Sequence, residues 1–125
     1  MAAFEHLIES YDVGDLLDDI ASADPPAYLH RCLAEGLSAP TLSWHRIQQP
    51  AVCALVLDAI VNDRDYGFFE RELIVDWRIH YAKAGLKMKD LAVQALHRVL
   101  ERDRPKDADA AAELEVLANR LAGTE

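Results

Sequence analysis

The stretch AVCALVLDAIVN, residues 51–62, is the strongest indication of the fold class, because it is almost wholly apolar and carries a single charge, Asp58. A run of this kind is consistent with either a buried strand or a buried helix. Its length and its three alanines favour the helix. No second stretch of the sequence offers a strand with which it could pair. Residues 51–62 are therefore predicted to form a buried helix.

On the N-terminal side of this stretch, apolar residues also recur at helical spacing. The sequence Asp24-Pro25-Pro26 is typical of a helix start, and Gly36 suits the left-handed residue that follows a helix end. A short helix is therefore predicted over 25–35, and the segment between the prolines at 40 and 50 is expected to hold one or two helical turns. The first helix is predicted from the spacing of Phe4, Leu7, Ile8 and Tyr11.

On the C-terminal side, residues 66–84 form the longest predicted helix, which Gly85 is expected to end. Two polar strips divide its surface, and apolar residues lie on both sides between them. A helix that is apolar on two sides is packed from two sides, so this helix is predicted to be the central one. One side carries Phe69, Leu73, Trp77, His80 and Ala84, and the other carries Phe68, Val75, Ile79 and Ala82.

Two further helices complete the prediction. Residues 88–100 place apolar side chains at i, i+3, i+4 and i+7, and Arg98 is assigned to the opposite, polar face. After Pro105, either Asp107 or Asp109 is expected to cap a last helix that ends at Gly123. The predicted fold is thus all-α, a single domain over residues 1–125. It is a compact bundle of five or six helices, and one way to build such a bundle is from helical hairpins.

Composition limits the class of function. The chain has 125 residues, is 51% hydrophobic and carries a net charge of −9. It can bury a core without metal or disulfide, and its charge disfavours nucleic acid and anionic membrane surfaces. Cys32 and Cys53 lie among apolar neighbours and are read as reduced core residues. The apolar runs are too short to cross a bilayer and the N-terminus does not resemble a secretory signal, so a cytoplasmic location is expected.

Charge is segregated along the chain. Residues 1–63 contain ten acidic and two basic residues, whereas residues 64–106 contain seven acidic and ten basic ones. These parts could attract each other within one fold or pair with a complementary partner. The expected partner is another protein. A basic surface on that protein would be complementary to the acidic N-terminal part of this chain. A homodimer is an alternative use of the apolar surface, and solvated faces that only keep the chain soluble are another reading of the charge.

Residues 77–105 resemble a tetratricopeptide-type helical hairpin. The stretch Tyr81-Ala82-Lys83-Ala84-Gly85 resembles the end of the first helix of that repeat, and Ala92, Leu96 and Pro105 stand near its small, large and terminating positions. Any antiparallel helical hairpin would share part of this pattern. The resemblance implies a scaffold that grips a peptide or a protein, with the strip Glu72, Asp76 and Lys83 facing the partner.

Two i, i+4 pairs could instead supply metal ligands. Asp76 with His80, and His97 with Glu101, each place a carboxylate and an imidazole on one helix face. If the two pairs came from adjacent helices, they would form a four-ligand site in a helical bundle. An intrahelical hydrogen bond or ion pair within each couple is the competing interpretation.

Other catalytic patterns are weak. The serines stand in cap or turn contexts, and no Gly-x-Ser-x-Gly elbow or phosphate-binding glycine loop occurs. The favoured hypothesis is a protein-interaction module without catalysis and without a cofactor, of the antitoxin, immunity, chaperone or adaptor type. A helical-bundle metalloprotein or enzyme that uses Asp76, His80, His97 and Glu101 is the alternative hypothesis.

Overall fold

A computed structural model describes residues 13–38, 44–62 and 71–123. In chain order these contain α2 (Val13–Ser22), α3 (Pro25–Ser38), α4 (Trp44–Asn62), α5 (Arg71–Arg102) and α6 (Ala108–Ala122). No strand occurs within these ranges, so the all-α prediction is confirmed. The helix predicted over residues 4–11 lies outside the described residues, as do Phe68 and Phe69.

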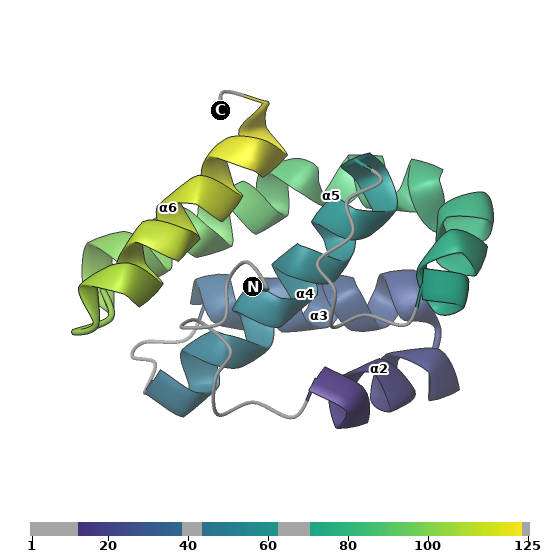
Figure 1. Cartoon of the computed structure of the whole chain (residues 1–125), viewed down its shortest axis with the longest axis horizontal. Helices are drawn as coiled ribbons and strands as arrows, with labels where there is room; N and C mark the ends of the chain where they lie inside the picture. The colour runs from purple at the N-terminus through teal and green to yellow at the C-terminus, as the bar shows by residue number, and fades with distance from the viewer. Residues whose placement is uncertain (1–12, 39–43, 63–70, 124–125) are drawn as a thin grey trace.

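Residues 51–62 form the last part of the buried helix α4. Every residue from Pro50 to Ile60 is buried, and the side chains of Val52 to Leu57 are fully inaccessible. Helix α4 lies in the middle of the molecule in Figure 1 and packs against α3, α5 and α6. An unbroken apolar sequence is explained by this position, since a helix with packed neighbours on every side has no face for polar residues.

The helix predicted to be central is therefore not the innermost one. Helix α5 does contact α3, α4 and α6, but only one side of its first part is packed. Ile74 and Trp77 are buried, whereas Val75 and Ile79, which were expected to be packed on the opposite side, are exposed. The sequence could not show this, because an apolar side of a helix looks the same whether the fold covers it or leaves it for a partner.

Two glycines that were expected to end helices lie inside them. Helix α3 continues past Gly36, and α5 runs through Gly85 without interruption. A side chain at position 36 would meet Pro50, with a Cβ placed 2.9 Å from the proline Cβ, and one at position 85 would meet Val61 Cγ2 at the same distance. At both positions, glycine allows two helices to pack closely. Close packing therefore selects glycine, as a helix end does.

Pro50 is the third such correction, because it lies inside α4 instead of separating two segments. Its ring packs against Gly36, although proline cannot donate the backbone hydrogen bond that a helix interior normally uses. Both ends of α6 are as predicted. Asp107 caps α6 by accepting from the backbone N–H groups of Asp109 and Ala110, and Gly123 ends α6 in the left-handed conformation with φ of 78°.

Candidate functional site

The exposed face of the first part of α5 is the strongest candidate site. Large apolar side chains on this face are open to solvent: Ile79 is 74% exposed, Leu86 55% and Val75 41%. Their spacing of four and seven residues places them in one line along the helix, with half-buried Ala82 between Ile79 and Leu86. Isolated exposed apolar residues are ordinary, but an aligned group edged by charge is typical of a protein-binding surface.

Charged side chains border this line. Glu72, Asp76 and Lys83, the three residues predicted to face a partner, are all exposed and lie on the adjoining strip of the same helix. The apolar line Val75, Ile79, Ala82 and Leu86 together with Glu72, Asp76, Lys83 and Lys87 is called the α5 face below. The sequence pointed to the strip Glu72, Asp76 and Lys83, whereas it assigned Val75, Ile79 and Ala82 to a packed side of the helix.

The rest of the same helix surface explains why this face stays outside. Trp77 and Met88 are buried on the opposite side, where they join the apolar core. Arg78 donates a hydrogen bond from Nε to the carbonyl oxygen of Ile60, at 3.1 Å, and so ties α5 to the end of α4. These contacts fix the rotation of α5 about its axis, and that rotation turns Ile79 outward.

Asp76 and His80 lie in contact, as expected from their spacing. Oδ1 of Asp76 lies 3.4 Å from Nε2 of His80, and both side chains are about 60% exposed. An exposed pair of this kind contributes little to stability. His80 was expected to lie on the packed side of the helix, and that expectation is wrong.

The two histidine–carboxylate pairs do not meet. Both belong to the single helix α5, and about 25 Å of helix separates position 80 from position 97 at 1.5 Å per residue. One metal ion cannot bridge that length, since its ligands lie within a few ångströms of it. Within the described ranges, no group of three or more histidine, cysteine or carboxylate side chains is arranged to hold a metal ion. The four-ligand site built from Asp76, His80, His97 and Glu101 is therefore not formed.

The cysteines are free and buried, as predicted. They lie on facing helices α3 and α4, and Nε2 of Gln49 donates to Sγ of Cys32 at 3.5 Å. A hydrogen bond from the Cys53 thiol lowers the pKa of Cys32, whereas that same bond together with burial raises the pKa of Cys53. With Cys32 only 2% exposed and Cys53 fully covered, neither sulfur is open to a substrate in this structure.

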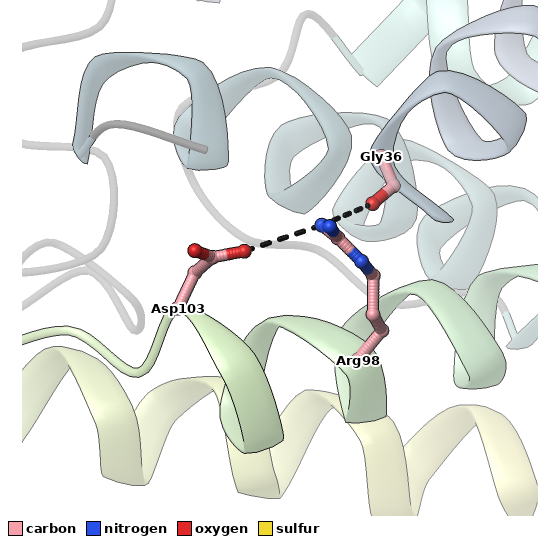
Figure 2. A network of polar contacts seen from close by, with 3 residues as sticks. All are labelled: Gly36, Arg98 and Asp103. Carbon is pink, nitrogen blue, oxygen red and sulfur yellow. Dashed lines mark hydrogen bonds and ion pairs between the residues drawn. The ribbon is translucent and has the colours of Figure 1, made fainter. Parts of the chain in front are cut away.

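Arg98 is the buried polar residue that sequence reasoning missed. It was assigned to the exposed face of its helix, yet it is only 7% exposed. Figure 2 shows its Nη1 between the carbonyl oxygen of Gly36, at 3.1 Å, and Oδ2 of Asp103, at 3.2 Å. On a helical wheel Arg98 lies beside Leu91, at the border of the apolar stripe, which is the signal that could have placed it correctly.

This network joins helices and offers no reactive group. The guanidinium spans α3 and the end of α5, and its carboxylate partner is as deeply covered as the arginine itself. A buried ion pair of this geometry holds the packing in one arrangement and is costly to break. We therefore assign it a structural role and leave the α5 face as the candidate site.

Comparisons with known protein families, with curated proteins and with solved structures find no match to this chain. The tetratricopeptide resemblance stays a prediction, although the helix end that it implies at Gly85 is absent because residues 71–102 form one helix. Among the described helices, none is both long enough and apolar enough to cross a membrane.

Proposed function

We propose that this chain is a protein-interaction module without catalysis, of the antitoxin, immunity, chaperone or adaptor type, that acts in the cytoplasm through the α5 face. The observation that supports this most is the exposure of Ile79, the most exposed large apolar side chain of the described residues. Leaving such a side chain in water forgoes the free energy that its burial would provide, on the order of 2 kcal/mol. A bound partner that covers Ile79 would recover that free energy.

The charges bordering the apolar line support the same proposal. Interfaces combine an apolar centre with a polar rim that sets the orientation of the partner. On the α5 face, Ile79 lies at the centre, with Asp76 and Lys83 beside it and Glu72 and Lys87 further out. The exposed acidic residues of α2, Asp15, Asp18 and Asp19, are a second surface, and they would suit a partner with basic groups.

The proposal is tested by affinity capture from native lysate with the wild-type chain and two variants. Ile79→Glu places a charge in the centre of the face, and Val116→Glu makes the same kind of change on α6, where Val116 is 43% exposed. We expect wild type and Val116→Glu to retain the same protein, and Ile79→Glu to lose it. Equal retention by all three, or no retention above background by the wild type, would contradict the proposal.

A further inference from the structure

We propose that the partner bound on the α5 face is a second copy of this chain, with the two α5 helices antiparallel about a two-fold axis near residues 80 and 81. This inference rests on the proposed function, because it uses the same face. It goes further by naming the occupant, and it is derived from the order of apolar and charged residues along the helix.

The apolar line is symmetric about the proposed axis. In an antiparallel pair related by a two-fold axis, a residue meets the one that lies equally far on the other side of the axis. Val75 and Leu86 are each about 8 Å from the midpoint along the helix, and Ile79 and Ala82 are each about 2 Å from it. Val75 of one copy would thus meet Leu86 of the other, and Ile79 would meet Ala82, so that every member of the apolar line is covered.

The charged residues of the α5 face are ordered so that the face is complementary to a second copy running in the opposite direction. Glu72 and Asp76 precede the midpoint, whereas Lys83 and Lys87 follow it, and all four side chains are exposed. In the antiparallel pair, Asp76 of one copy lies opposite the segment between Lys83 and Lys87 of the other copy. A parallel pair would instead set the charged strip of one copy beside the apolar line of the other, so that the opposite charges would not meet. The charge order therefore selects the antiparallel arrangement.

The same balance makes a uniformly charged partner a poor fit for this face. A basic surface would attract Asp76 and repel Lys83, and an acidic surface would do the reverse. The two acidic and two basic side chains of the face sum to zero charge. The face needs a partner whose basic and acidic residues follow the matching order. A second copy of the chain, running antiparallel, has that order.

The shape of α5 indicates where contact is closest. Its first part lies at one edge of the molecule and its last part runs behind α6, so the helix changes direction along its course (Figure 1). Gly85 faces α4, where it is buried against Val61, and a helix that wraps around its core is convex toward solvent. Two convex faces touch most closely near the axis, so Ile79, Asp76 and Lys83 dominate the contact. We expect a small interface and an association that depends on concentration.

Charge reversal tests this arrangement directly. Asp76→Lys leaves only basic residues near the axis, and Lys83→Glu brings two acidic residues to it, so each variant repels its own copy. In a mixed pair, the lysine introduced in one copy would lie near the glutamate introduced in the other, which restores complementarity. Sedimentation equilibrium of wild type, each variant alone and the equimolar mixture measures the four association constants. Glu101→Lys, a reversal of an exposed charge on the same helix but far from the axis, is the matched control.

We expect wild type and Glu101→Lys to dimerise with the same constant, each single reversal to weaken dimerisation about tenfold, and the mixture to recover most of that loss as a heterodimer. The recovery cannot come from misfolding, because two unfolded chains would not repair each other. A wild-type chain that stays monomeric up to about 1 mM, or a mixture no stronger than the single variants, would overturn the proposal.

The two proposals fail in different ways. If the chain is monomeric while Ile79→Glu still abolishes capture of a different protein, the second-copy proposal is wrong and the α5 face remains a binding surface. If Ile79→Glu alters neither dimerisation nor capture, the proposed function is wrong as well.

Discussion

Arg98 in α5 donates a hydrogen bond from Nη1 to the carbonyl oxygen of Gly36 in α3 at 3.1 Å, across 62 positions of the chain. The same nitrogen lies 3.2 Å from Oδ2 of Asp103, and the side chains of both residues are 7% exposed. One guanidinium thus satisfies a backbone carbonyl near the end of one helix and a carboxylate just after the end of another. This contact holds the last part of α5 against α3.

Replacing Arg98 by methionine should lower the free energy of unfolding by about 3 to 5 kcal/mol, because the carboxylate of Asp103 would stay buried without its partner. Urea unfolding followed by circular dichroism measures the loss. The matched control is Arg104→Met, which breaks the pair with Glu115, at 2.8 Å and about half exposed. That change should cost less than about 1 kcal/mol. Equal losses for the two variants would show that the Arg98 pair is not buried as described.

Gly36→Ala should destabilise the protein, although alanine is the better helix former by about 1 kcal/mol. The new methyl group would lie 2.9 Å from Cβ of Pro50, in a ring that cannot rotate away. Overpacking of this kind costs about 1 to 3 kcal/mol, so the net change is a loss. Gly14, exposed in the first turn of α2, provides the control, since Gly14→Ala should leave thermal stability unchanged or raise it. A higher melting temperature for Gly36→Ala would contradict the close packing of α3 on α4.

Stability should fall with rising pH above about 9. Burial raises the pKa of Tyr28 above its ordinary value of 10.0, and the hydrogen bond to Cys32, together with burial, raises the pKa of Cys53 well above 9.0. The unfolded chain releases these protons first, so the folded state binds more protons and loses stability at about 1.4 kcal/mol per pH unit for each retained proton. The lowered pKa of Cys32 acts in the opposite sense, and its contribution levels off only as the pH rises past the ordinary cysteine value of 9.0.

Urea unfolding at about pH 8, 9.5 and 10.5 checks this pH dependence. In Tyr28→Phe, the free energy of unfolding should fall less steeply above pH 10. When both cysteines are replaced by alanine, it should fall less steeply between pH 9 and 10. Identical slopes in wild type and variants would show that these groups are not held in their protonated forms by the fold.

Ile79→Ala should change the free energy of unfolding by less than about 0.5 kcal/mol, as is usual for an exposed position. Trp77→Ala, two residues earlier on the buried side of the same helix, should cost about 3 to 5 kcal/mol. This comparison separates the outward rotation of α5 from the packing on two sides that the sequence suggested. A large loss for Ile79→Ala would mean that Ile79 belongs to the core.

The fold class followed from the sequence, because helical spacing, the Asp24-Pro25-Pro26 start and the Asp107 cap depend on neighbouring residues only. The corrections at Gly36, Gly85 and Pro50 share one cause. A glycine or proline that ends a helix and one that lets another helix approach look alike until the distant contact is known. Arg98 was misplaced for the same reason, since its partner Gly36 is remote in the chain.

The candidate site was half predicted. Glu72, Asp76 and Lys83 were placed on one exposed strip because charge on a helix surface is a local signal. Ile79 was placed on a packed side and the exposure of Leu86 was not predicted, because exposure of an apolar side chain depends on whether any other helix covers it. Asp76, His80, His97 and Glu101 failed as a metal site because the sequence did not reveal that Gly85 continues the helix and keeps the two pairs apart.

Site-specific photo-crosslinking in native cells tests most simply whether the α5 face binds a protein. A photoreactive phenylalanine analogue at position 79 should form a covalent adduct with protein, and the same group at position 116 on α6 should not. For the antiparallel pair, the adduct has twice the 14.0 kDa mass of the chain. Absence of any adduct at position 79, or equal adducts at both positions, would show that the α5 face does not bind a protein.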